Sequence, residues 1–140
     1  METWRCGPHL GEFEPPDIIH SHIRGPIEEE HARECVRVTL EEFGKKRGIR
    51  IFFIAHMEAD IPGGPFTPAA RTYLASAKLD WKAIVVVGGN PFTRLAASVV
   101  TLGLSLLSDN RMPTKMVKSV EEAREYVAEL RAKEAARAAA

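Results

Sequence analysis

Several features that would quickly identify a function are scarce in this sequence. Only two cysteines, Cys6 and Cys35, occur among 140 residues, too few and too far apart for a disulfide scaffold or a cysteine-rich metal site. Nineteen basic residues balance nineteen acidic residues, so the chain has no net charge that would attract nucleic acid or an anionic membrane. Aromatic residues make up only 7% of the chain and do not interleave with basic ones. We therefore expect no nucleic-acid partner.

The chain also lacks a hydrophobic run long enough to cross a membrane. The longest apolar stretch covers residues 95–107 and contains Ser98, Thr101, Gly103 and Ser105, whereas a spanning helix needs about 20 apolar residues. The first residues have neither the basic flank nor the apolar run of a signal peptide. Scattered thiols are typical of a reducing compartment. We expect a cytoplasmic protein without a membrane span.

The composition that is present is that of one globular domain. Of the 140 residues, 45% are hydrophobic and 27% charged, and a chain of this length can bury one core. No repeat or linker divides it. We expect an N-terminal extension over residues 1–8, a domain over 9–130 and a frayed, alanine-rich tail over 131–140.

Five segments have the patterns of strands. Ile18–Ile23 alternates apolar and polar residues, which predicts one buried face. Ile51–Ala55 and Ala83–Val87 are continuously apolar, as parallel strands covered on both faces are. Two shorter segments, at 10–13 and 114–117, complete the set. The two apolar segments should lie side by side in the middle of a sheet.

Four segments have the patterns of helices, at 27–46, 68–77, 92–107 and from 120 onwards. Thr67 before Pro68 is a natural N-cap, and Ser119 followed by Glu122 is a capping box. The order β-β-α-β-α-β-α-β-α predicts a single α/β domain. Its sheet should be mixed and mostly parallel, with about five strands and with the first strand antiparallel at an edge.

This order resembles that of the STAS domain, in its SpoIIAA-like branch, which is grouped with Sec14-like lipid-binding domains. The likeness covers residues 9–130 and rests on four stretches: Ile18–Pro26 with its Arg-Gly ending, Ile51–Ala55 with its polar loop, Ala83–Val87 followed by Phe92-Thr93-Arg94, and Val117–Ala123. The resemblance implies a non-catalytic regulatory module that binds another protein, as an anti-sigma-factor antagonist or signalling adaptor does. The alternative that it implies is a protein that binds a lipid or a nucleotide.

One departure from the family concerns its phosphorylation site. Antagonists of this family carry a phosphorylatable serine at the start of the second helix, in an Asp-x-Ser-Gly-type setting. Residues 59–68 read ADIPGGPFTP here, so only Thr67 could take the phosphate. The candidate phosphosite or partner surface is therefore Thr67 with Asp60, Gly63 and Gly64. The simpler interpretation is that Thr67 caps the helix, and the two roles are compatible.

A second candidate site follows the strand at residues 83–87. Gly88, Gly89, Asn90, Thr93 and Arg94 precede or begin a helix at the carboxyl end of a predicted parallel strand, where open α/β sheets bind ligands. Free N–H groups there favour an anion such as a nucleotide phosphate. No glycine-rich phosphate-binding motif is present, and ordinary turn chemistry explains the same residues.

The remaining candidates are a histidine cluster and an apolar helix. His20 and His22 share one strand face, and zinc would need His56 and a carboxylate from Glu58 or Asp60 as further ligands. The polar face of a sheet explains this pattern equally well, so we expect no metal, no cofactor and no catalytic residues. The helix at 92–107 could be core, line a lipid pocket or form an interface, including that of a homodimer.

Overall fold

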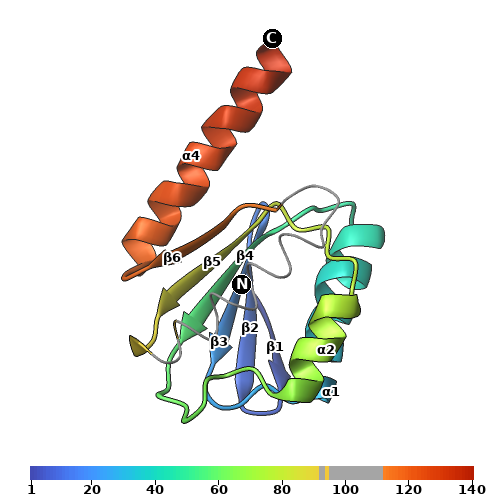
Figure 1. The fold of residues 1–140 in the computed structure, drawn as a ribbon. Coiled ribbons are helices and arrows are strands. Elements are labelled where there is room, and N and C mark those ends of the chain that lie inside the picture. The colour runs from blue at the N-terminus through green and yellow to red at the C-terminus, as the bar shows by residue number, and fades with distance from the viewer. Residues whose placement is uncertain (92–93, 95–111) are drawn as a thin grey trace.

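The computed structural model describes residues 1–91, 94 and 112–140. Its described part is an α/β fold around one six-stranded sheet in the order β1-β2-β3-β4-β5-β6 (Figure 1). The strands are β1 (Glu2–Cys6), β2 (His9–Glu14), β3 (Ile18–Ile23), β4 (Phe52–Met57), β5 (Ala83–Gly88) and β6 (Thr114–Val117). The α/β class and the mixed sheet are thus as predicted.

The number and direction of the strands differ from the prediction. β1 pairs antiparallel with β2, and β2 antiparallel with β3, whereas β3, β4, β5 and β6 run parallel to one another. Two of the five pairings are therefore antiparallel, and the expectation of a mostly parallel sheet of about five strands was wrong. Because β1 lies outside β2, the predicted first strand at 10–13 is an inner strand and not an edge.

The additional strand comes from residues 2–6, which the sequence predicts to be an N-terminal extension. β1 and β2 are joined by Gly7 and Pro8, and Gly7 has a φ of +61°. A two-residue hairpin loop favours a glycine with positive φ at its first position. Gly7 also has no room for a Cβ, which would lie 2.3 Å from Nε2 of His31. Residues 2–6 therefore belong to the sheet.

The two central strands confirm the main sequence prediction. β4 and β5 pair in parallel, from Phe52 opposite Ala83 to Met57 opposite Gly88. Phe52, Ile54, Ala83 and Val85 have no exposed surface. Burial on both faces is the reason that these segments are apolar without alternation.

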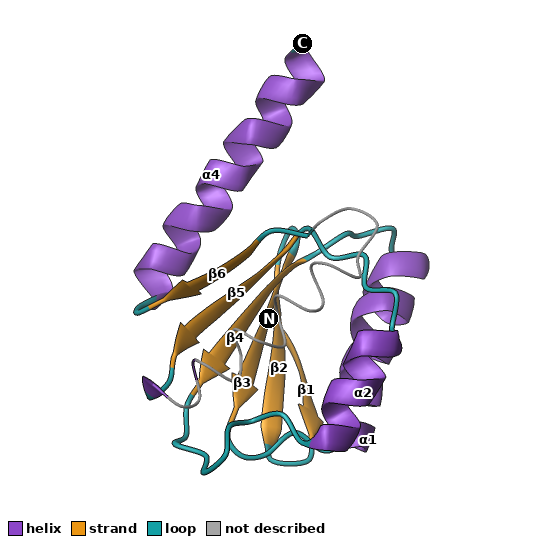
Figure 2. Ribbon diagram, in the orientation of Figure 1, coloured by secondary structure: helices purple, strands orange, loops and turns teal. Residues whose placement is uncertain are grey.

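Helices cover the two faces of the sheet unequally (Figures 1 and 2). The helix α1 (Glu29–Val36), the π-helical segment η1 (Arg37–Lys45) and the helix α2 (Pro68–Ser76) pack on one face, and α4 (Val120–Ala139) packs on the other. The predicted helix at 27–46 is thus two segments and begins at Glu29, because Ile27 instead pairs with Phe66 in a short parallel bridge. The predicted helix at 92–107 lies outside the described residues.

The last helix is held at its N-terminal half. Ala123 and Val127 are buried against β5 and β6, and Arg124 makes a bidentate ion pair with Glu14 of β2 at 2.7 and 2.8 Å. The helix continues to Ala139, so the tail expected to fray is helical here, and its last residues are exposed as the helix extends away from the sheet (Figure 1). Among the described residues, no helix is both long and apolar enough to traverse a bilayer.

Candidate functional site

Alternation along β3 gives the two faces of the sheet different chemistry. Ile19 and Ile23 belong to the apolar core beneath α1, η1 and α2, and Ser21 lines a cavity on the same face. The intervening residues, His20 and His22, point to the opposite face. Each face carries one candidate site: an apolar cavity on the first and a histidine cluster on the second.

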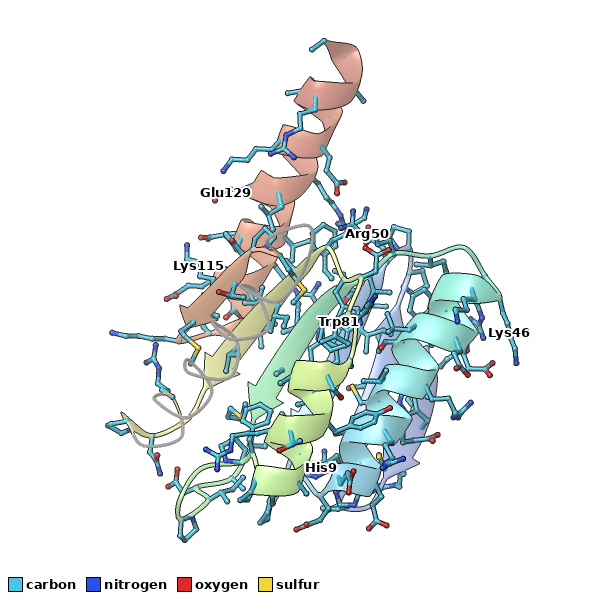
Figure 3. The ribbon with its side chains drawn as sticks, turned by 45° about the vertical axis from the view of Figure 1, so that its right-hand side comes forward. His9, Lys46, Arg50, Trp81, Lys115 and Glu129 are labelled. Carbon is cyan, nitrogen blue, oxygen red and sulfur yellow. The ribbon has the colours of Figure 1, made fainter. Side chains whose placement is uncertain are left out.

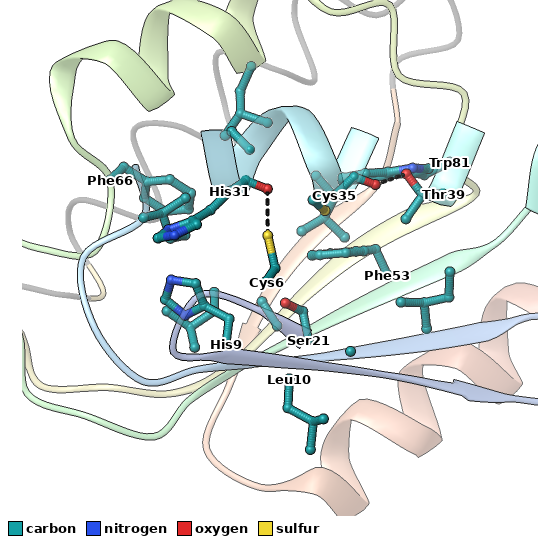
Figure 4. A pocket seen from close by; sticks show the side chains of 18 of the residues that line it. Cys6, His9, Leu10, Ser21, His31, Cys35, Thr39, Phe53, Phe66 and Trp81 are labelled. Atoms are coloured by element: carbon teal, nitrogen blue, oxygen red, sulfur yellow. Dashed lines mark hydrogen bonds between the residues drawn. The ribbon is translucent and has the colours of Figure 1, made fainter. Parts of the chain in front are cut away.

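The cavity lies between the sheet and the layer of α1, η1 and α2 (Figure 4). Its volume is about 80 Å³. Phe53 of β4, Ile84 and Val86 of β5 and Leu74 of α2 supply much of the apolar wall. None of the described residues that line it is Lys, Arg, Asp or Glu.

The two ends of the cavity differ. Figure 4 shows His9 and Phe66 towards one end, and Thr39 and Trp81 towards the other. Figure 3 places His9 and Trp81 correspondingly far apart along the layer of α1 and α2. Phe66 is only half-buried, whereas Trp81 is 3% exposed. The end at Trp81 is therefore the deeper one.

Both cysteines face this cavity, and both thiols are poor nucleophiles there. Cys6 Sγ donates to the carbonyl oxygen of His31 at 3.4 Å, and burial raises the pKa of its thiol. Burial raises the pKa of the Cys35 thiol to about 12, with smaller contributions from Cys6 and Glu34. Because the thiolate is the reactive form, this environment favours the inert role expected for Cys35.

His9 is held neutral at the shallower end. Its Nδ1 accepts a hydrogen bond from the Arg24 backbone N–H at 3.2 Å, so the proton resides on Nε2, which lies 3.3 Å from the Pro26 carbonyl oxygen. Burial, followed by the neighbouring His31, lowers the pKa of His9. Its ring stands edge-on to that of His31, with centroids 5.0 Å apart. The cavity therefore has no cationic group from His9 at neutral pH.

Trp81 has an unusual polar atom at the deeper end. Its indole stacks on Phe53, with ring centroids 4.4 Å apart and planes 7° from parallel. Its Nε1–H is buried and has no hydrogen-bond partner among the described residues. Buried indole N–H groups normally find an acceptor, so this unpaired donor is an exception, although the atom itself has no surface open to the cavity.

The opposite face carries a network of three histidines. His20 Nδ1 lies 2.8 Å from His56 Nε2, and His20 Nε2 lies 3.2 Å from Glu14. His22 stacks on His56, with centroids 4.6 Å apart, and its two ring nitrogens contact Glu58 and Glu12 respectively.

Charges around this network set the protonation of its buried members. Burial, with smaller contributions from the neighbouring His22 and His20, lowers the pKa of His56 to about 4. Hydrogen bonds from Arg124 lower the pKa of Glu14 to about 2 against the effect of burial. Across the described ranges, no group of three or more His, Cys, Asp or Glu side chains is arranged to hold a metal ion. The arrangement is a hydrogen-bonded network across β2, β3 and β4.

The structure brings together part of the second predicted site, beyond the carboxyl ends of β4 and β5. An open hollow there is lined by Glu58, Asp60, Gly89 and Asn90, together with Met57 and Ala59. Burial would raise the pKa of Glu58, but hydrogen bonds from Arg24 and His22 offset it and the net pKa is lowered. Two carboxyl groups in the wall would repel a phosphate, so the hollow gives the nucleotide interpretation no support.

Gly88 and Arg94, which were also predicted for this site, do not line the hollow. Gly88 ends β5, and the Arg94 N–H donates to the Asn90 carbonyl oxygen at 2.9 Å, as in a first helical turn. Thr93 lies outside the described residues. Gly63 and Gly64 have positive φ angles in the loop before α2.

Thr67 has the capping role that the sequence predicted. Its Oγ1 accepts from the Ala70 N–H at 3.2 Å and donates to the Ile27 carbonyl oxygen at 2.8 Å. The side chain therefore caps α2 and ties its start to the chain just before α1. Asp60 and Gly63 are exposed nearby in sequence, whereas Gly64 is buried.

Sequence reasoning missed the cavity and most of the residues that line it. Trp4, Cys6 and His9 reach it because residues 2–6 are a strand, and the Gly7-Pro8 pair was the available signal for that hairpin. Nothing in the local sequence around Trp81 indicates that its indole faces a cavity.

Comparison of this chain with models of known families, with curated proteins and with solved structures found no match.

Proposed function

We propose that this chain is a non-catalytic regulatory module that binds a small, largely apolar molecule in the cavity under α1 and α2. The observation that carries the proposal is the cavity itself, about 80 Å³ with an almost wholly apolar wall. Close-packed cores leave few voids of this size, and apolar cavities stay dry and take up small apolar molecules. Its size suits a molecule of a few heavy atoms, or one end of a longer molecule.

Two residues connect the cavity to the outer side of α2, where we propose that a protein binds. Phe66 and Leu74, before and within α2, line the cavity, while Ala69, Arg71 and Thr72 on the same helix are exposed. A bound molecule would press on the inner side of the helix whose outer side a partner could contact. The STAS resemblance stays a prediction, and it supplies the kind of partner expected, namely another protein.

Thr67 adds a way in which modification could act on the same helix. A phosphate would remove the hydroxyl proton that Thr67 donates to Ile27, and it would place about −1.5 to −2 charges at the start of α2. The helix dipole favours that charge, whereas the lost bond would free the loop from Ile27. Phosphorylation would therefore alter the surface that we propose for the partner.

The cavity can be tested by filling it. Ser21→Val adds apolar volume to the cavity from β3, where a β-branched residue suits the strand. We expect xenon to shift the methyl NMR signals of Leu74 and Ile84 in the natural protein and not in this variant. The variant should also be about 1 kcal/mol more stable, because it buries added carbon in an existing void.

Thr72→Val, on the exposed side of α2, is the matched control and should leave the xenon response unchanged. Mass spectrometry of an organic extract of the purified protein would identify a molecule carried from the cell. A natural protein whose methyl signals ignore xenon, with an empty extract, would refute cavity binding. A pulldown tests the link to a partner protein. If Ser21→Val captures the same proteins as the natural protein, filling the cavity does not affect partner binding, and the link is refuted.

A further inference from the structure

We infer that β1, an edge strand of the sheet (Figure 2), pairs with β1 of a second copy of this chain, so that two six-stranded sheets join across a two-fold axis at Trp4. The inference concerns a surface other than the cavity and does not depend on the proposed function. It rests on three observations: backbone groups of β1 that point away from the sheet, an indole packed away from the edge, and a cation that lacks an ion pair.

The outer backbone groups of β1 are open to a further strand. β1 and β2 join through a two-residue loop, so Cys6 and His9, which flank the loop, bond to each other. Because bonding alternates along an antiparallel ladder, the N–H and C=O groups of Thr3 and Arg5 point away from β2. Among the described residues, no backbone bond from outside the sheet reaches these groups. The strand also has no proline and no bulge that would prevent pairing.

The side chains of β1 leave this edge accessible. The Trp4 ring lies over Gly11 of β2, where an added Cβ would come within 2.3 Å of the ring, and it packs on Phe43 at a centroid distance of 5.6 Å. The indole is thus folded inwards over the sheet and does not extend past its edge. Thr3 and Arg5 are exposed and lie on the opposite face. A second strand can therefore approach β1 without displacing Trp4.

A two-fold axis at Trp4 gives the pairing that uses all five residues of β1. In this antiparallel register, Thr3 of one copy lies opposite Arg5 of the other, and Trp4 lies opposite Trp4. Because Thr3 and Arg5 carry the outward backbone groups, they exchange N–H···O=C bonds on both sides of the axis. An axis at Thr3 would shorten the overlap and place Arg5 opposite Met1. The register centred on Trp4 is therefore the one that we propose.

The same register brings an unpaired cation to a carboxylate. Arg5 lies opposite Leu10 in its own sheet, and it forms no ion pair with any described residue. Glu12 lies opposite Thr3, so the partner's Glu12 is two strands, or about 10 Å, from Arg5, which an arginine side chain spans across the short Thr3. One oxygen of Glu12 contacts His22, and the other has no partner among the described residues. This charge complementarity favours a second copy as the occupant of the edge.

The backbone pairing is tested with two substitutions of one residue. Sedimentation equilibrium of the natural protein should show a monomer that becomes a dimer as the concentration rises to about 1 mM, because the interface is small. Thr3→Pro removes an outward N–H, which an edge strand tolerates. It should weaken dimerisation about tenfold and leave the urea midpoint of the dilute protein unchanged. Thr3→Val keeps the N–H and the β-branched shape, so this matched control should dimerise as the natural protein does.

The register is tested by reversing charges. Arg5→Glu should weaken dimerisation about tenfold, because a second carboxylate then faces the partner's Glu12. Combining it with Glu12→Arg should restore the affinity to within about threefold of the natural value. Hydrogen exchange of the Thr3 and Arg5 amides should slow as the protein concentration rises. Exchange of the Trp4 amide, which bonds to β2 within one chain, should not change.

Three results would overturn the inference. A natural protein that stays monomeric at about 1 mM does not pair through this edge. A dimer that forms equally well in Thr3→Pro uses another surface of the chain. If Arg5→Glu dimerises as well as the natural protein, the register centred on Trp4 is wrong.

Discussion

The two faces of this sheet are packed differently: one carries an apolar layer with a cavity, and the other buries a network of polar side chains. Beneath α1 and α2 the wall is apolar, a cavity remains, and the indole N–H of Trp81 has no partner among the described residues. On the other face, polar residues are buried, but His20 is hydrogen-bonded to both His56 and Glu14. Arg124 of α4 completes that network.

This difference shows where a binding site can be expected. A hydrogen-bonded polar network of this kind is held rigid by its mutual contacts. A cavity with a largely apolar wall offers the space and the apolar surface that are features of small-molecule sites. We therefore place ligand binding on the face with α1 and α2, and structural stability on the face with the histidines.

The largest expected effect contrasts two neighbouring phenylalanines of β4. Phe52 has no exposed surface and faces the α4 side, whereas Phe53 borders the existing cavity. Phe52→Ala should lower the free energy of unfolding by about 4 kcal/mol and Phe53→Ala by about 3 kcal/mol, because Phe53 already lacks neighbours on its cavity side. Urea denaturation measures both values. Equal losses would indicate that the cavity closes in solution.

The next effect is a loss of folding stability at acidic pH that arises from His56. The folded pKa of His56 is about 4, below its ordinary 6.5, so as the pH falls below 6.5 the unfolded chain takes up the proton first. Stability should therefore be lost between pH 6.5 and 4, by about 3 kcal/mol from this residue. His56→Gln should lose less over this range in urea denaturation at several pH values.

Two other groups must be separated from His56 in that experiment. His9 on the cavity face also has a lowered pKa and contributes with the same sign. Glu14, whose pKa is lowered to about 2, contributes only as the pH falls below 4.5. The difference between natural protein and variant above pH 4.5 therefore isolates His56. Parallel curves for the two proteins would show that His56 is not a buried neutral histidine.

The smallest expected effect concerns the N-caps of two helices, α2 on one face of the sheet and α4 on the other. Thr67 Oγ1 makes hydrogen bonds to both Ala70 and Ile27, whereas Ser119 accepts one from the Glu122 N–H at 3.2 Å. Thr67→Ala should cost about 1.5 kcal/mol and Ser119→Ala about 1 kcal/mol in thermal unfolding. Thr67→Ser, which keeps the hydroxyl, should restore most of the loss. A smaller cost at Thr67 would mean that its contact with Ile27 contributes little.

Much of the fold was predictable because local patterns are strong in this chain. The strands at Ile18–Ile23 and Thr114–Val117 have the bounds that alternation and turn residues predict. The capping box was half right, since Ser119 caps Glu122, while the Glu122 side chain accepts from Lys118 and not from Ser119. The π-helical segment was not predictable, because the spacing of its apolar residues is close to that of an α-helix.

The candidate site was much less predictable than the fold. Of the second predicted site, Gly89 and Asn90 do line a hollow, which they share with Asp60 from the first predicted site. They meet because carboxyl ends of neighbouring parallel strands share one edge. The acidity of that hollow depends on Glu58, which the sequence analysis considered only as a metal ligand. The cavity requires Cys6, Cys35 and Trp81 to meet from three distant segments.

The sequence by itself determined the buried strands β4 and β5, the helix starts at Thr67 and Ser119, and the assignment of His20 and His22 to one face. These features depend on periodicity and on contacts between residues close in the chain. Only the tertiary structure decided that β1 joins the sheet, that the histidines have partners, and that Trp81 does not. Whether a buried polar group is paired depends on side chains from distant segments, and local sequence does not contain that information.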